Sequence, residues 1–269
     1  MSGDVPNDPF VIPQERLPPG FAEQIERPPA VAVEPKPAAT AVLIRDGDTG
    51  LEVLLLKRHR ASGFVPGAYV FPGGRVDAAD AQVFWPVKTP EPSAEYWVAA
   101  IREIFEETGV LLARDRAGAW AASSAQDAQL EAWRERLLGE TAGLQELIDG
   151  ERFTLAADSM VYIAHWITPV AEPRRYDTRF FLAGLPPGAE VKADPREMTD
   201  AVWLTPASAL ARFEAGNLPM VFPTVKTLQL LAPYVTVADA LQDLNGRTVQ
   251  PILPRLVRTG TGVGLVIEE

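Results

Sequence analysis

The chain has 269 residues, of which 47% are apolar and 23% charged, values typical of a soluble globular protein with one large domain or two small ones. Its formal net charge of −11 disfavours binding to a nucleic-acid backbone, and the lack of cysteine excludes disulfides, a thiolate metal site and a cysteine nucleophile. Residues 1–10 do not resemble a secretory signal, and no apolar run is long enough to span a bilayer. These features favour a cytoplasmic protein without nucleic-acid or membrane partners.

Proline dominates the beginning of the chain. Residues 1–37 contain nine of the 25 prolines, including Pro18-Pro19 and Pro28-Pro29. Because proline fixes φ and lacks a backbone N–H, we predict an extended arm here rather than regular helix or sheet. The main domain is expected over residues 38–235, and residues 236–269 are expected to form an extension packed on it.

A β-hairpin is predicted after the arm. Ala41–Ile44 and Leu51–Leu56 are apolar runs, and Asp46–Gly50 between them is rich in turn residues. Tyr69–Phe71 is expected to be a short strand that ends at Pro72-Gly73-Gly74.

A helix is predicted over Ser93–Thr108, where Trp97, Ile101 and Phe105 fall on one face and Gly109 provides a stop. We expect helices at 126–148, 206–215 and 224–231, strands at 160–168, 178–182 and 201–204, and one short helix with two short strands in the last 30 residues. The helical stretch around 115–150 is expected to form a cap or a homodimer surface.

Three glutamates carry the strongest chemical signal. Glu103, Glu106 and Glu107 are spaced i, i+3 and i+4, so their carboxylates share one face of the predicted helix. One interpretation is a solvated acidic face. The other is a site for a divalent cation such as Mg²⁺, which prefers oxygen ligands and would offset the repulsion between the carboxylates.

The surrounding residues favour the second interpretation. Arg102–Val110, together with the glycine turn at Gly74, resembles the Nudix box G-x5-E-x7-R-E-U-x-E-E-x-G-U, in which U is apolar. The resemblance implies the Nudix fold, an α/β/α sandwich with a mixed β-sheet, here with a helical insertion. It also implies a hydrolase that acts on diphosphate bonds.

The sequence departs from the box in two ways. Gly74 and Arg102 are 28 positions apart where the box has 14, so we expect an insertion of about 14 residues, roughly Ala79 to Pro92. The early glutamate of the box, counted back from Arg102, falls on Ala94, which makes the adjacent Glu95 the candidate substitute. The partner of Arg102 is therefore left open.

By resemblance, Glu103, Glu106 and Glu107 would bind Mg²⁺ or Mn²⁺, and the carbonyl of Gly73 would complete the metal shell. Arg102 would orient Glu103 through a charge-assisted contact. The general base in this family is a box glutamate or an acid on a later loop. Glu197 is the candidate for the later acid, and a surface loop residue is the alternative for it.

The substrate follows from the branch of the family. Segments 71–77, 165–169 and 174–181 resemble the acyl-CoA diphosphatase branch, within an overall resemblance over residues 40–230. This branch implies CoA or acyl-CoA as the substrate. The alternatives are ADP-ribose or a dinucleotide, or a Nudix-fold binding module without catalysis. The candidate phosphate-binding residues are Arg58, Arg174 and Arg175, with the wider 57–60 cluster as a second option.

Overall fold

A computed structural model describes residues 10–13, 25, 32–60, 66–88, 91–121 and 127–267. Two compact units are present. One comprises Ala38–Ala164 and Arg179–Val249, and the other Met1–Pro37, His165–Thr178 and Gln250–Glu269. The proline pairs of the predicted arm lie outside the described residues. Within the described part of the chain, no helix is long and apolar enough to cross a membrane.

The predicted hairpin forms the centre of a mixed sheet. Strands β2 (Lys36–Gly47) and β3 (Gly50–Arg58) are antiparallel, with Ile44 opposite Val53 and a tight turn at Gly47↔Gly50. The sheet has the order β10-β3-β2-β9-β8-β11, and two short strands, β4 (Tyr69–Val70) and β5 (Gly73–Arg75), pair with β3 and β2. The remaining strands are β8 (Met160–Ile167), β9 (Tyr176–Gly184), β10 (Met198–Leu204) and β11 (Pro251–Ile252). Strand β10 pairs antiparallel with β3, and β11 pairs in parallel with β8.

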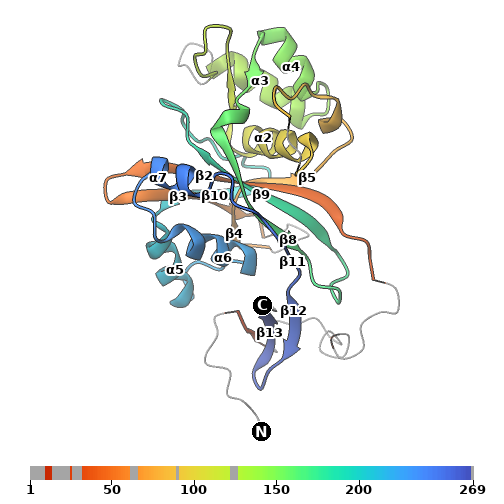
Figure 1. Ribbon diagram of the computed structural model, residues 1–269, viewed down its shortest axis with the longest axis vertical. Helices are drawn as coiled ribbons and strands as arrows, with labels where there is room; N and C mark the ends of the chain where they lie inside the picture. The colour runs from red at the N-terminus through yellow and green to blue at the C-terminus, as the bar shows by residue number, and fades with distance from the viewer. Residues whose placement is uncertain are drawn as a thin grey trace. The chain divides into compact units, whose positions relative to one another are not determined.

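Helix α2 (Ala94–Thr108) carries the three glutamates and confirms the helix predicted from the apolar face. It ends at Gly109, whose φ of 74° is the left-handed conformation that glycine adopts without strain. In the main unit, α2, α3 and α4 lie over one face of the sheet and α5 and α6 over the other, which gives the α/β/α layers (Figure 1).

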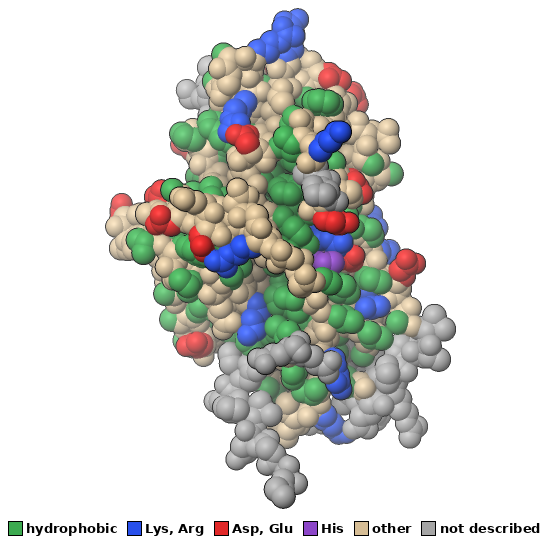
Figure 2. Space-filling model, viewed as in Figure 1, with side chains coloured by type: hydrophobic (Ala, Val, Ile, Leu, Met, Phe, Trp, Pro, Cys, Tyr) green, Lys and Arg blue, Asp and Glu red, His purple; other side chains and the backbone are tan. Residues whose placement is uncertain are grey.

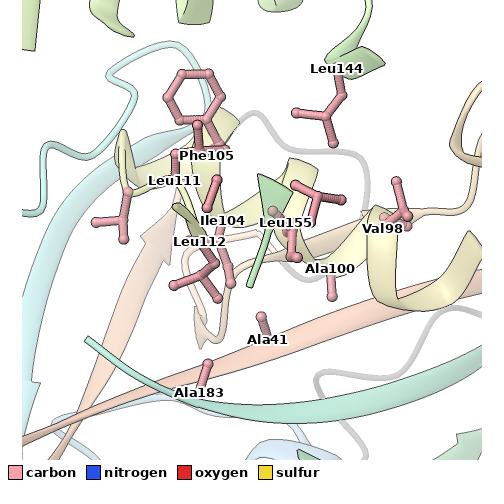
Figure 3. Packing of buried hydrophobic residues seen from close by; sticks show 14 of the residues in the cluster. Ala41, Val98, Ala100, Ile104, Phe105, Leu111, Leu112, Leu144, Leu155 and Ala183 are labelled. Carbon is pink, nitrogen blue, oxygen red and sulfur yellow. The ribbon is translucent and has the colours of Figure 1, made fainter. Parts of the chain in front are cut away.

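The core lies between α2 and the sheet. Ala41 of β2 and Ala183 of β9 stand beneath α2, opposite Ala100 and Ile104, while Leu144 of α4 lies on the other side of the helix (Figure 3). These residues belong to one cluster of buried side chains shared by the helix and the sheet. This packing fixes the position of the helix, and with it the direction of its glutamates.

The helix predicted over 126–148 is two helices, so the prediction of a single helix was wrong. Helix α3 (Asp127–Leu138) ends before a turn at Gly139–Gly143, in which Glu140 has a φ of 53°, and α4 (Leu144–Glu151) follows. Leu137 and Leu144 are buried on either side of the turn. The break lets the two helices fold back as a cap over α2.

The rest of the chain follows the predicted order, but the described part of the last 30 residues contains three short strands where two were predicted. Helices α5 (Pro206–Glu214), α6 (Phe222–Leu231) and α7 (Val237–Leu244) belong to the main unit. The second unit contains a small sheet of the order β1-β13-β12, formed by Ile12–Pro13, Gly262–Val266 and Arg255–Arg258. The proline-rich arm therefore contributes a short strand, contrary to the prediction. Four further short elements are β6 (Ala113–Arg114), β7 (Thr154–Leu155), η2 (Asp80–Gln82) and η3 (Ala157–Ser159).

Candidate active site

The three glutamates of α2 are largely withdrawn from solvent. Glu107 is 4% exposed, and the side chains of Glu103 and Glu106 are 13% and 18% exposed. A solvated acidic face is therefore excluded. Ionised carboxylates are costly to bury without a partner, so the groups around them determine what this site can do.

Arg102 is the main partner, and all five of its N–H groups are used. Its Nη1 donates to Glu103 Oε1 at 2.8 Å and to Glu106 Oε2 at 3.0 Å. Its Nη2 donates to the Arg75 carbonyl at 2.8 Å and to Asp80 Oδ2 at 3.1 Å, and its Nε donates to Asp80 Oδ1 at 2.9 Å. The guanidinium plane is thus fixed, with one edge facing the glutamates.

Asp80 is the acid that sequence analysis missed. Its side chain is 2% exposed, and it also accepts from the backbone N–H of Asp77 at 2.8 Å. Asp80 lies six positions after Gly74, where the box has its early glutamate, so the insertion falls between Asp80 and Arg102. The substitute expected at Glu95 was wrong, because Glu95 instead accepts from Ser93 Oγ at 2.6 Å.

The glycine turn lies directly against the glutamates. The backbone N–H of Gly73 donates to Glu107 Oε2 at 3.3 Å. A Cβ on Gly74 would stand 2.4 Å from Glu103 Oε1, so only glycine leaves this carboxylate in place. The turn thus sets the positions of Glu103 and Glu107 through backbone atoms alone.

A later loop brings Glu197 to the same place. The backbone N–H of Asp194 donates to the Glu107 carbonyl at 3.0 Å, and the backbone N–H of His59 donates to the Glu197 carbonyl at 2.9 Å. Buried Arg134 of α3 donates to the Glu106 carbonyl at 2.9 Å and to the Lys192 carbonyl at 2.9 Å. Sequence analysis missed Arg134, since nothing local separates it from other helical arginines.

Burial and the repulsion between neighbouring carboxylates raise the pKa values of the glutamates on α2. Burial, opposed by Arg102 and reinforced by Glu106 and Glu197, raises the pKa of Glu103 to about 7. Burial together with the charges of Glu103 and Glu197 raises the pKa of Glu107 well above its usual value, against the opposing effect of Arg58.

The pKa of Glu106 is also raised above its usual value. Burial raises its pKa, Arg102 lowers it, and the charges of Asp80 and Asp77 raise it further. The negative charges around α2 therefore exceed what Arg102 and Arg58 compensate.

The donor set fits a hard divalent cation. Among the described residues, no three acidic or histidine side chains are already gathered around one point, and Arg102 holds Glu103 and Glu106 along one edge. The chemistry nevertheless matches Mg²⁺ or Mn²⁺, since carboxylate oxygens predominate and carry excess charge. Glu103, Glu106 and Glu107 are the residues that could hold such an ion.

The predicted phosphate-binding arginines lie in different surroundings. Arg58, at the end of β3, is near enough for its charge to lower the pKa of Glu107. Arg174 is exposed and Arg175 is 7% exposed, and both belong to the second unit. The guanidinium of Arg175 donates to the carbonyls of Val33 at 2.7 Å and Thr168 at 3.0 Å.

Comparison with known proteins identifies the family of the chain. The NUDT19 Nudix domain matches residues 88–231, more than half of the chain, and the NUDIX domain matches residues 35–136. The chain therefore belongs to the NUDT19 Nudix domain family of Nudix hydrolases. The predicted Nudix membership is confirmed.

The individual proteins that resemble this chain share less than 30% of its sequence. The chain is 29% identical over 222 residues to "Putative nudix hydrolase 7" of Caenorhabditis elegans, covering 82% of this chain and 68% of that protein. It is 29% identical over 257 residues to "Acyl-coenzyme A diphosphatase NUDT19" of Gallus gallus, covering 76% and 67%. A crystal structure of a NUDIX hydrolase from Alicyclobacillus acidocaldarius is 28% identical, with a TM-score of 0.67, covering 81% of this chain and all of that one.

Proposed function

We propose that this Nudix hydrolase requires a divalent metal ion and cuts the diphosphate of a nucleoside-diphosphate derivative, with CoA or acyl-CoA as the leading substrate. The observation that carries the proposal is the excess of buried carboxylate charge beside the Gly73-Gly74 turn. The CoA class is supported by the relatives named acyl-coenzyme A diphosphatase.

In this mechanism Glu103, Glu106, Glu107 and the Gly73 carbonyl would hold Mg²⁺ or Mn²⁺. When bound, the ion supplies Lewis acidity to the diphosphate oxygens and lowers the pKa of the attacking water. Arg102 keeps Glu103 and Glu106 oriented before the ion arrives.

The proton of the attacking water needs an acceptor. We assign this role to Glu197, because its charge acts on both Glu103 and Glu107 and it comes from a separate loop. Glu103, with a pKa of about 7, is the rival within the box.

Arg58 is assigned to a phosphate oxygen of the diphosphate, since it already lies by Glu107. Arg175 fits this role poorly, because backbone carbonyls use its buried guanidinium. Arg174 stays a prediction.

A substrate panel tests the proposal. CoA, an acyl-CoA, ADP-ribose and a dinucleotide are assayed with Mg²⁺, with Mn²⁺ and with EDTA. The proposal expects metal-dependent cleavage, fastest for CoA or acyl-CoA. Faster cleavage of ADP-ribose or the dinucleotide would reject the CoA class alone, and binding without cleavage of any compound would favour a binding module.

A further inference from the structure

The loop that carries Glu197 is long and irregular. All residues from 185 to 197, which join β9 to β10, are described, and none of them lies in a helix or strand. Glu197 itself is exposed. Loops of this length without regular structure are uncommon in a compact domain and are usually functional. The position of Glu197 relative to the buried glutamates of α2 therefore depends on the contacts that hold the loop.

The C-terminal end of α2 holds one side of this loop. The last four carbonyls of an α-helix have no partner within the helix. In α2 the Glu107 carbonyl accepts from the Asp194 N–H at 3.0 Å, and the Thr108 carbonyl accepts from the Lys192 N–H at 2.8 Å. The loop thus completes the end of the helix on which the glutamates lie.

Arg134 of α3 joins the same two segments from the cap. Its Nε donates to the Glu106 carbonyl and its Nη2 to the Lys192 carbonyl, both at 2.9 Å. The basic side chains visible in Figure 2 lie at the surface, whereas Arg134 is 4% exposed. Its ion-pair partner Glu131 stands 3.7 Å away and is 43% exposed. A guanidinium is costly to bury, so this one depends mainly on backbone carbonyls, at a helix end that favours a cation.

The contacts continue into the turn before β10. Asp194 is buried, its carbonyl accepts from the Glu197 N–H at 3.2 Å, and its Oδ1 accepts from Arg196 Nε at 2.8 Å. Arg196 also donates to Glu135 of α3 at 3.0 Å. That outer pair is 50% and 57% exposed, and exposed pairs contribute little to stability. The buried contacts of Arg134 are therefore the main link from α3 to the loop.

We propose that Arg134 is a positioning residue, which holds the loop against the C-terminal end of α2 and thereby sets where Glu197 stands relative to the glutamates. The inference rests on the proposed function, in which Glu197 accepts the proton of the attacking water. Misplacing a catalytic group by about 1 Å can cost roughly a hundredfold in rate, so the helical cap gains a role in the reaction through this one side chain.

Hydrogen exchange in EDTA tests the holding of the loop without metal, substrate or turnover. In the wild type the amides of Lys192 and Asp194 should be protected, because both donate to carbonyls of α2. In Arg134→Gln, a peptide spanning 190–197 should exchange at least about tenfold faster, while peptides from the β2–β3 hairpin should be unchanged. Arg136→Gln, also on α3 but 46% exposed, is the matched control and should exchange like the wild type.

A double-mutant cycle tests the link to Glu197. On the best substrate of the panel, Arg134→Gln should lower kcat by at least about tenfold and change KM by less than about threefold. Glu197→Gln should also lower kcat, and adding Arg134→Gln to it should cost little more, because the arginine acts through Glu197. Independent, multiplicative losses would overturn the proposal. Full turnover of Glu197→Gln alone would instead reject Glu197 as the general base, a failure of the proposed function that the exchange measurement does not share.

A second variant covers the case in which Arg134→Gln does not fold, since it leaves buried carbonyls unpaired. Arg134→Lys keeps the charge but lacks the planar fork that serves two carbonyls, so loop exchange should rise and kcat should fall by about threefold or more. Melting temperatures establish which variants are folded. A lysine variant with the exchange and turnover of the wild type would overturn the proposal. So would a folded glutamine variant whose loop exchanges as slowly as that of the wild type.

Discussion

Asp80 and Arg102 form a two-point ion pair, in which Asp80 Oδ1 accepts from Nε at 2.9 Å and Oδ2 accepts from Nη2 at 3.1 Å. A bidentate pair fixes the plane of the guanidinium as well as its position. The opposite edge of the same guanidinium holds Glu103 and Glu106. Asp80 therefore acts on the carboxylates through Arg102, as a positioning residue.

Asp80→Asn should lower kcat by about tenfold and weaken the apparent affinity for Mn²⁺, because the arginine loses the carboxylate that fixes its plane and the glutamates lose their orientation. Asp77→Asn is the matched control. Its carboxylate is 3.8 Å from Arg102 Nη2 and 55% exposed, so kcat should stay within about twofold. Steady-state kinetics over a Mn²⁺ series measure both effects, and equal behaviour of the two variants would remove the positioning role.

Gly74→Ala should abolish most activity with little loss of stability. The added Cβ would stand 2.4 Å from Glu103 Oε1, and the carboxylate is the mobile end of a side chain, so it moves rather than the backbone. We expect a rate loss of about a hundredfold, in line with misplaced catalytic groups. Gly260→Ala, which meets nothing within 4 Å, is the control for both assays. A Gly74→Ala enzyme with normal turnover would show that Glu103 need not occupy this position.

Glu106→Gln should reduce the rate by about two orders of magnitude, because it removes the charge of a positioned group and keeps its shape. Its melting temperature in metal-free buffer should hold or rise, since burial raises the pKa of Glu106 and the ionised form is therefore disfavoured in the fold. Glu95→Gln, on the same helix but hydrogen-bonded to Ser93, should leave turnover nearly unchanged. Near wild-type turnover of Glu106→Gln would contradict its place in the site.

The free energy of unfolding of the metal-free protein should fall as the pH rises toward neutrality. The pKa of Glu103 is raised from 4.5 to about 7, so the folded protein holds this proton more tightly than the unfolded chain. The tighter binding of this proton adds about 3 kcal/mol to the free energy of unfolding. This stabilisation is fully present below pH 4.5 and is lost as the pH rises through 7. Thermal melts in EDTA from about pH 5 to pH 8 should show the wild type losing stability relative to Glu103→Gln. A constant difference between them would contradict the raised pKa.

The sequence predicted the parts of the fold that depend on local pattern. The hairpin around Asp46–Gly50 follows from two apolar runs with turn residues between them, and helix α2 follows from a 3.6-residue period. Both formed as predicted. The glutamate spacing on α2 was informative for the same reason, since it is set within one helix.

Contacts across the insertion could not be predicted in this way. Counting back from Arg102 places the early acid of the box at Ala94, whereas counting forward from Gly74 places it at Asp80. Only the folded chain shows that Asp80 is the acid that contacts Arg102. The role of Arg134 and the break between α3 and α4 are likewise long-range features, set by packing on α2.

The central claim is that the glutamates of α2 hold a divalent ion that hydrolysis requires. The most direct measurement is the release of adenosine 3′,5′-bisphosphate from CoA, followed by chromatography in EDTA and again after Mg²⁺ or Mn²⁺ is restored in excess. The account predicts that release stops in EDTA and returns with either metal for the wild type, and stays about a hundredfold lower for Glu106→Gln. Full turnover in the chelator would contradict it.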